Sequence, residues 1–138
     1  MSYLLDTDIC ITLIRHKPPA LLQQLTRHTL DEIAISSITA AELQFGVQKS
    51  QYPERNQRAL EQFLLPLSII AFDYAAAMHY GQIRAALERQ GMPIGALDLL
   101  IAVHALSLTY TLVTNNEREF ARVPGLQWEN WASVAGTG

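Results

Sequence analysis

The stretch YLLDTDICITLIRH, residues 3–16, indicates the fold class of this chain. Residues 3–5 are apolar and form a short buried strand that ends at Asp6. From about residue 8 to residue 16 the pattern becomes that of a helix. A strand that leads directly into a helix is the repeating unit of α/β proteins.

The same alternation continues along the chain. Further strands are predicted at residues 33–35, 67–72, 111–113 and 126–128. Helices are predicted at residues 20–28, 39–49, 54–64, 74–90 and 96–108. This order predicts a mostly parallel sheet with helices on both faces, a three-layer α/β/α arrangement. We expect a single domain over residues 1–134 and a frayed tail at residues 135–138.

The composition is that of an ordinary globular protein. Hydrophobic residues make up 49% of the 138 residues and charged residues 17%, which excludes intrinsic disorder. The net charge of −3 means that a nucleic acid must be met by a local basic patch or through bound cations. Cys10 is the only cysteine, so a disulfide framework is impossible and a reducing cytoplasm is expected. We expect no signal peptide and no membrane span.

Acidic residues stand where ligands are expected. Parallel sheets bind ligands at the carboxyl ends of their strands, and Asp6 lies at such an end. A structural alternative is that Asp6 or Thr7 caps the following helix. Glu42 also has a structural alternative, because Thr39 and Glu42 have the spacing of a capping box.

Asp98 is harder to explain structurally. It is the only formally charged residue of ALDLLIAVHALSL, residues 96–108, a helix that is apolar on nearly every side. An unpaired carboxylate in a buried helix is costly, and no Arg or Lys lies between Arg89 and Arg118. We therefore interpret Asp98 as functional. His104, on the same helix, is interpreted as a satisfied core histidine, since the histidines form no zinc pattern.

The loop TNNEREF, residues 114–120, follows the strand at 111–113. Asparagine-rich strand ends are usually turns. If the strands are parallel, however, this loop leaves the same edge of the sheet as Asp6. Asn116 or Glu119 is then expected to face the other acids.

Convergence of Asp6, Glu42 and Asp98 would require a compensating charge. Two carboxylates about 5 Å apart repel by roughly 3 kcal/mol at an effective dielectric of 20. Three such pairs cost on the order of 10 kcal/mol, which is comparable with the stability of a domain. The cluster must bind a proton or a cation, and oxygen ligands select Mg²⁺ or Mn²⁺. Mg²⁺ in turn favours a substrate that contains phosphate.

Four segments, in this order, resemble the PIN-domain ribonucleases and, among them, the VapC-type toxins of bacterial toxin–antitoxin pairs. The segments are LLDTD with Asp6, ISSITAAELQFG with Glu42, PIGALDLLIAVHA with Asp98 and LVTNNEREF with Asn116. The resemblance covers residues 3 to about 131. It implies a parallel sheet between helices, cleavage of single-stranded or looped RNA with Mg²⁺ or Mn²⁺, and inhibition by a VapB-type antitoxin.

The resemblance also implies roles for individual residues. Asp6 and Asp98 would hold the metal, and Glu42 would complete the acidic cluster. Many relatives have Asp where this chain has Asn116, and Glu119 is expected to compensate. The TNNEREF segment resembles that of toxins that cut initiator tRNA in the anticodon loop. A homodimer is expected as well.

Six cations are candidates for contacts to phosphate, although most are expected to be ordinary surface charges. They are Arg15, Lys17, Arg27, Arg84, Arg89 and Arg118.

Two other functions are compatible with parts of the sequence. LLDTD and LVTNN look like motifs of haloacid-dehalogenase-type phosphatases, with Asp6 as nucleophile. That family needs a later Lys, and none follows Lys49. The second alternative is a binding module of the same fold whose nuclease site has decayed, which Asn116 would favour.

Overall fold

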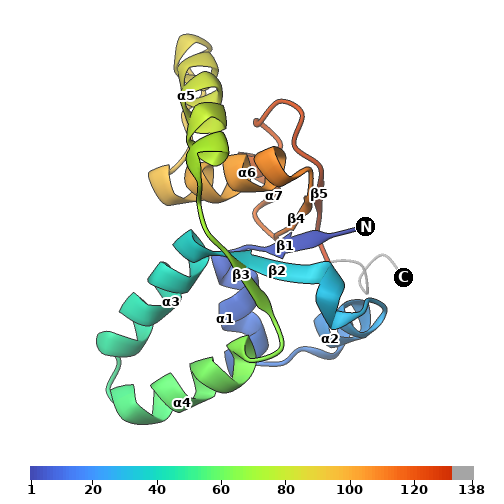
Figure 1. The fold of residues 1–138 in the computed structure, drawn as a ribbon, viewed down its shortest axis with the longest axis vertical. Helices are drawn as coiled ribbons and strands as arrows, with labels where there is room; N and C mark the ends of the chain where they lie inside the picture. The colour runs from blue at the N-terminus through green and yellow to red at the C-terminus, as the bar shows by residue number, and fades with distance from the viewer. Residues whose placement is uncertain (132–138) are drawn as a thin grey trace.

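Strand β1 (Tyr3–Leu5) is the middle strand of the fold, and all three of its residues are buried. In the computed structural model, which describes residues 1–131, five strands form one sheet in the order β3-β2-β1-β4-β5 (Figure 1). The other strands are β2 (Ile33–Ser36), β3 (Ser68–Ile70), β4 (Thr111–Val113) and β5 (Trp128–Glu129). Every pairing is parallel, which confirms the predicted sheet. The tail predicted at residues 135–138 lies outside the described residues.

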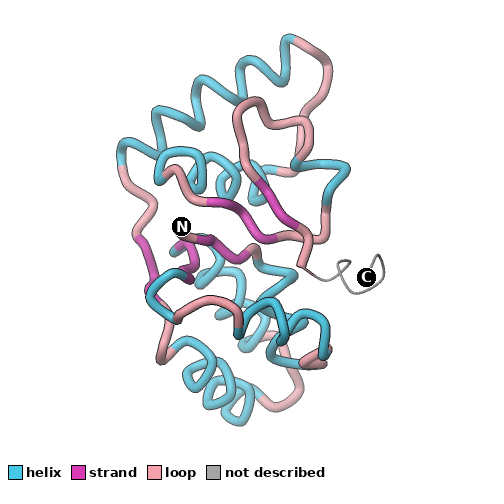
Figure 2. Tube along the Cα trace, turned by 90° about the vertical axis from the view of Figure 1, so that its right-hand side faces the viewer, coloured by secondary structure: helices cyan, strands magenta, loops and turns pink. Residues whose placement is uncertain are grey.

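Helices cover both faces of this sheet, as Figure 2 shows. They are α1 (Thr7–Arg15), α2 (Pro19–Thr26), α3 (Ser37–Gln48), α4 (Pro53–Leu64), α5 (Tyr74–Arg89), α6 (Ala96–Leu108) and the short α7 (Glu117–Phe120). A 3₁₀ turn, Leu30–Glu32, precedes β2. No helix in residues 1–131 is both long and apolar enough to cross a membrane.

The alternation of side chains along the strands divides the core into two layers. Tyr3 and Leu5 pack on one face of the sheet with helices α1 to α4. Leu4 points to the other face, where it packs with Leu112 and the buried side of α6. The three-layer α/β/α architecture is therefore confirmed.

The predicted start of α3 is wrong by two residues. The helix begins at Ser37, because the Ser36 side chain caps it by accepting a hydrogen bond from the backbone N–H of Ile38 at 3.0 Å. Thr39 is therefore inside the helix and buried, and the proposed capping box with Glu42 does not form. Two further differences are that β3 is shorter than the predicted 67–72 and that α7 forms in a segment expected to be loop.

This topology brings four elements to one edge of the sheet. Asp6 follows β1, and Thr114 follows β4, the neighbouring parallel strand. Asp98 lies in the first turn of α6. Helix α3, which carries Glu42, begins at the end of β2.

Candidate active site

Asp6 is the most deeply buried acid at this edge, with an exposed fraction of 4%. Its backbone N–H donates to the Val113 carbonyl at 3.0 Å. Its Oδ1 accepts from the backbone N–H of Ile9 at 2.8 Å, so of the two residues considered as caps, Asp6 and Thr7, it is Asp6 that caps α1. Burial raises the pKa of Asp6 to about 6, although the hydrogen bonds from Thr114 and Ile9 act in the opposite direction.

Glu42 reaches the same region from α3. Its Oε1 accepts a hydrogen bond of 2.6 Å from the hydroxyl of Thr7, the first residue of α1. The Thr7 hydroxyl also lies 3.3 Å from that of Thr39. The carboxylate of Glu42 is therefore held by a contact between two helices and does not fold back onto its own helix.

Asp98 and Glu119 form a hydrogen-bonded pair of carboxyl groups. Burial raises the pKa of Asp98 to about 7, and the hydrogen bond to Glu119 and the charges of Glu119, Asp6 and Glu42 add to this effect. The backbone N–H of Gly95, which donates to Glu119 Oε1 at 2.6 Å, lowers the pKa of Glu119. Asp98 therefore carries the shared proton, and Glu119 is the ionised partner.

Asn116 faces Glu119 with its amide nitrogen. Its Nδ2 donates to Glu119 Oε2 at 2.8 Å, and its backbone N–H donates to the hydroxyl of Thr114 at 3.0 Å. The loop after β4 thus places both predicted residues, Asn116 and Glu119, beside Asp98. Of the two glutamates in this loop, Glu119 is the one that interacts with Asp98, whereas Glu117 accepts a hydrogen bond from Asn130.

A family model for the PIN domain matches residues 3–126. The chain belongs to the PIN-domain family. It is 46% identical over 132 residues to a tRNA(fMet)-specific endonuclease VapC of Shigella flexneri, covering 96% of this chain and 99% of that protein.

Solved structures resemble nearly the full length of this PIN domain. A DNA-bound VapBC from Salmonella typhimurium has a TM-score of 0.92 and 44% identity, covering 96% of this chain and 99% of that chain. VapBC2 from Rickettsia felis, bound to a DNA fragment from its promoter, has a TM-score of 0.87 and 47% identity, covering 95% and 99%. The haloacid-dehalogenase alternative has no support in these findings.

The acids of this PIN domain have little compensation from basic side chains: the charge of Arg122 helps to lower the pKa of Glu119, but the two form no ion pair. Within residues 1–131, no ion pair joins Asp6, Glu42, Asp98 or Glu119 to a Lys or Arg side chain. Their donor atoms are all oxygen, which suits a hard divalent cation. In the described part of the chain, however, no three His, Cys, Asp or Glu side chains are close enough to form a ready metal site. The oxygen ligands fit Mg²⁺ or Mn²⁺, while in the present arrangement Asp98 and Glu119 share a proton.

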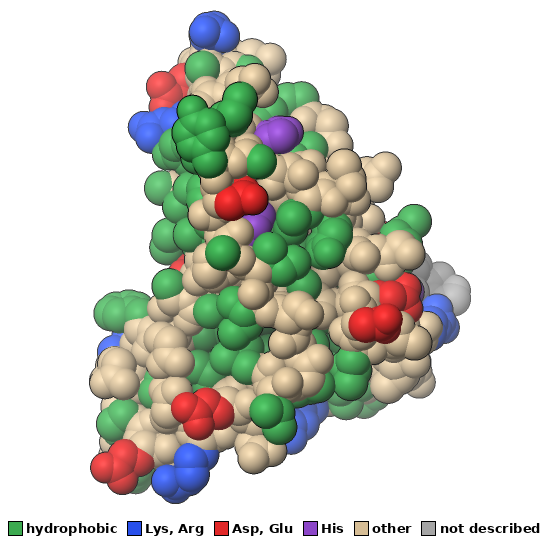
Figure 3. Space-filling view, viewed as in Figure 1, with side chains coloured by type: hydrophobic (Ala, Val, Ile, Leu, Met, Phe, Trp, Pro, Cys, Tyr) green, Lys and Arg blue, Asp and Glu red, His purple; other side chains and the backbone are tan. Residues whose placement is uncertain are grey.

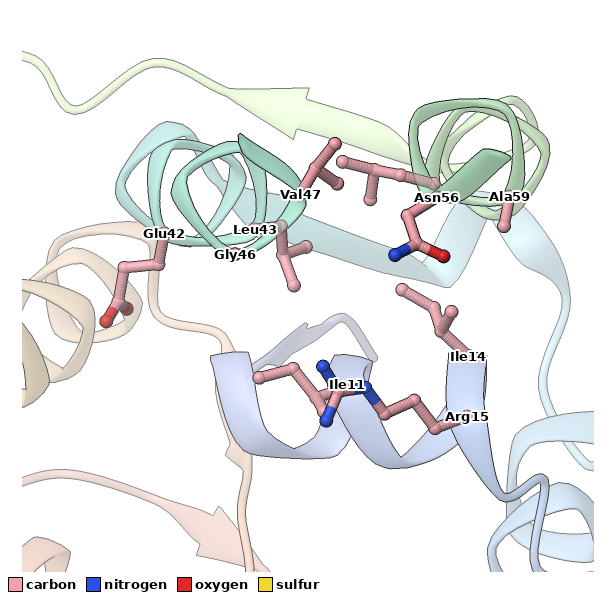
Figure 4. A pocket seen from close by; sticks show the side chains of 10 residues that line it. Ile11, Ile14, Arg15, Glu42, Leu43, Gly46, Val47, Asn56 and Ala59 are labelled. Carbon is pink, nitrogen blue, oxygen red and sulfur yellow. The ribbon is translucent and has the colours of Figure 1, made fainter. Parts of the chain in front are cut away.

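An apolar groove of about 120 Å³ lies beside the site, between α1, α3 and α4 (Figure 4). Glu42 lies at one end of it, and Asn56 and Ala59 lie at the other. Glu42 is the only one of the clustered acids that lines this groove. The acidic chemistry of the PIN domain is therefore next to the groove and not within it.

All five predicted site residues lie in one electrostatically connected group. The sequence reasoning missed the neutral residues that hold them: Thr7, Gly95 and Thr114. Thr7 follows β1 by two positions and Thr114 follows β4 by one position. Their closeness to these strand ends was the sequence feature that could have identified them as part of the site. Nothing in the sequence pattern distinguishes Gly95, which acts through its backbone N–H.

Proposed function

We propose that this chain is a VapC-type toxin, an endoribonuclease that hydrolyses RNA phosphodiester bonds with Mg²⁺ or Mn²⁺ held by Asp6, Glu42 and Asp98. The convergence of these acids from three different elements, without an ion-paired cation in the described residues, carries this proposal. A cluster of this kind is costly unless a proton or a cation compensates it.

The proposed substrate is tRNA, with the anticodon loop of initiator tRNA as the expected cleavage site. The name of the Shigella relative, a tRNA(fMet)-specific endonuclease, and its identity of 46% support this assignment. A toxin with this substrate acts in the cytoplasm, where tRNA is present. The homodimer expected from the sequence remains a prediction.

The residues of this chain have separate tasks in the proposed reaction. When bound, a divalent ion supplies a water of lowered pKa and neutralises the charge that develops on the phosphate. Asp6 is fixed by the N–H of Ile9, and Glu42 is oriented by the hydroxyl of Thr7. Asp98 must lose the proton that it shares with Glu119 before it can act as an anionic ligand.

The loop after β4 has a supporting task. Hydrogen bonds from Gly95 and Asn116 keep Glu119 ionised. Because Glu119 lies next to Asp98, it accepts the hydrogen bond from the protonated carboxyl group of Asp98. Asn116 brings no negative charge of its own. We therefore propose one firmly held ion rather than two.

The test is the cleavage of total tRNA by the purified, antitoxin-free protein. Discrete fragments should appear with Mg²⁺ or Mn²⁺ and should be lost with chelator and in Asp98→Asn. Asp31→Asn, which removes an exposed acid from the 3₁₀ turn, is the matched control and should cleave like the wild type. Cleavage that persists in Asp98→Asn would contradict the proposed site, and inactivity of the wild type with both ions would favour the decayed binding module.

The proposed partner is a VapB-type antitoxin, as in the VapBC structures that this chain resembles. The uncompensated acids suggest that it inhibits by placing a basic side chain against them. Expression of the chain alone should arrest growth, and coexpression of the antitoxin should restore it. Unimpaired growth at high expression of the wild type would contradict the toxin function.

A further inference from the structure

Exposed aromatic and basic side chains gather where α3 meets α4, at a surface that we call the α3–α4 corner. Its members are Phe45, Lys49, Tyr52, Arg55 and Arg58. Three of the ten Lys and Arg residues of the chain thus lie within ten positions. In the space-filling view, basic, hydrophobic and acidic side chains adjoin one another at this lower left corner of the molecule (Figure 3).

The two aromatic rings of the corner are exposed, and each has a cation beside it. Phe45 is 65% exposed and Tyr52 is 51% exposed. Lys49 Nζ lies 5.1 Å from the centre of the Phe45 ring, and the Arg55 guanidinium lies 4.5 Å from that of Tyr52. Each cation contacts one side of its ring, so much of each ring remains open to a stacking partner.

The cations of the corner are available for another partner. Within residues 1–131, no ion pair includes Lys49, Arg55 or Arg58. Glu54 lines the same shallow hollow as Arg55 and Arg58, yet it forms no ion pair with either. The corner therefore carries a local positive excess on a chain whose net charge is −3.

The corner also lies on a direct path from the acidic site. Phe45 follows Glu42 by three residues on α3, a rise of about 4.5 Å, and Lys49 follows it by seven, about 10 Å. Figure 1 shows α3 leading from the edge of the sheet outward to its junction with α4. A strand of RNA with one phosphate at the acids can therefore continue along α3 to the corner.

We propose that the α3–α4 corner is the RNA-binding surface of this toxin, an inference that rests on the proposed function. Unpaired bases of a looped RNA stack on Phe45 and Tyr52, while the neighbouring phosphates contact Lys49, Arg55 and Arg58. Alternating rings and cations match the alternation of bases and phosphates in a single strand. They also offset the repulsion that the acidic cluster exerts on RNA.

The test separates binding from cleavage by using Asp98→Asn as the background. Binding of a labelled anticodon stem-loop is measured by fluorescence anisotropy over a range of salt concentrations. Changing Phe45 and Tyr52 to Leu should weaken binding at least about fivefold for each ring. Changing Lys49, Arg55 and Arg58 to Gln should reduce the slope of log K against log salt by about 2, since each lost phosphate contact removes about 0.7.

The matched control changes three other exposed cations, Lys17, Arg27 and Arg89, to Gln. From the sequence these three are candidates for contacts to phosphate, but under the present proposal they are ordinary surface charges. These changes should leave the affinity and most of the salt slope in place. The proposal is overturned if the corner variants bind the stem-loop like the background protein, or if the control set causes the larger loss.

Two further measurements distinguish an RNA-binding surface from a protein interface, and RNA binding from cleavage. Corner variants that keep RNA binding but change the molar mass in light scattering, or lose antitoxin binding, would make the corner a protein interface and overturn the proposal. Cleavage is measured separately in the otherwise wild-type chain. If that chain binds RNA through the corner but cleaves none, the inference stands and the nuclease function fails.

Discussion

Asp6 illustrates how a proposed metal ligand can oppose the stability of its own fold. Its carboxyl group is buried, and burial raises its pKa from 3.8 to about 6. A raised pKa means that the folded state binds this proton more tightly than the unfolded state does. The stabilising contribution is complete below about pH 4 and is lost as the pH rises through about 6. At pH 8 the metal-free protein bears a cost of about 3 kcal/mol from this group.

Asp6→Asn should therefore stabilise the metal-free protein in a pH-dependent way. Asparagine keeps an oxygen that can accept from the backbone N–H of Ile9, so the cap of α1 is retained. We expect the free energy of unfolding to exceed that of the wild type by up to about 3 kcal/mol at pH 8, and by little at pH 4. Urea denaturation in chelator at both pH values measures this difference. An unchanged pH dependence in the variant would show that Asp6 is not the group that titrates.

Thr7→Val tests the neutral residue that orients Glu42. Valine has a shape close to that of threonine but cannot donate to Glu42 Oε1. We expect kcat for tRNA cleavage to fall by about tenfold, which corresponds to about 1.4 kcal/mol, with little change in KM. Thr26→Val, at the exposed end of α2, is the control and should cleave like the wild type. Equal kcat values for Thr7→Val and the wild type would show that the Thr7 hydroxyl does not orient Glu42 for catalysis.

The charged site residues could be predicted from the sequence, whereas their neutral partners could not. Asp98 was identifiable because a single charge in an apolar helix has to be explained. Glu42 was identifiable only through its place in the family's order of motifs, since the local pattern favoured a capping box. The real capping box of the chain is formed by Thr29 and Glu32. Spacing alone does not decide which serine or threonine begins a helix.

At the scale of elements, the strands and long helices follow from apolar runs and helix stop signals. Helix α5 starts after Asp73, whose side chain caps it by accepting a hydrogen bond from the backbone N–H of Ala76. It ends before Gly91, whose φ of 67° lies in the left-handed region that favours glycine. The short α7 could not be predicted, because four residues are too few for a periodic pattern. Its position depends on tertiary contacts such as the buried side chain of Phe120.

A polar contact in the core joins the start of α3 to α6. His104 Nδ1 lies 2.8 Å from the hydroxyl of Ser36, which also caps α3. The prediction of a satisfied core histidine is confirmed for Nδ1. The buried Nε2 makes no hydrogen bond of good geometry in the described residues, although the backbone of Ala71 interacts with the ring and acts to raise its pKa. Burial lowers the pKa of His104, so the ring is neutral at pH 7.

Ser36→Ala should accordingly destabilise the fold more than a surface serine change does. The variant loses a helix cap and leaves a buried ring nitrogen without a partner, at a combined cost of about 2–4 kcal/mol. Ser68→Ala, at an exposed position of β3, should change the free energy of unfolding by less than about 0.5 kcal/mol. Urea denaturation of both variants provides the comparison. A loss below about 0.5 kcal/mol in Ser36→Ala would mean that neither hydrogen bond contributes.

At the scale of the whole molecule, the fold brings acids from separate elements to one edge of the sheet and, in the described residues, forms no ion pair between them and a Lys or Arg side chain. The charges of Asp6 and Glu42, which lie far from Asp98 in sequence, raise the pKa of Asp98 only because β1, α3 and α6 meet at one edge of the sheet. In the metal-free protein, protons compensate the cluster only as the pH falls through about 7 and 6, where Asp98 and Asp6 take them up. A divalent cation held by this cluster would have to displace those protons.

This competition between protons and metal predicts that the metal stabilises the protein and that the stabilisation increases with pH. At a concentration a hundred times its Kd at pH 8, held constant across the experiment, Mg²⁺ or Mn²⁺ should raise the free energy of unfolding at pH 8 by about 2.7 kcal/mol. The gain should be largest at pH 8 and should shrink as the pH falls through about 7 and 6, where Asp98 and Asp6 take up protons. Thermal unfolding with the metal and with chelator, at pH 8 and pH 5.5, measures it. Asp98→Asn should lose most of the gain, while Asp31→Asn should keep it. A gain of equal size in both variants would place the ion elsewhere on the molecule, because only the first variant removes a carboxylate from the acidic cluster.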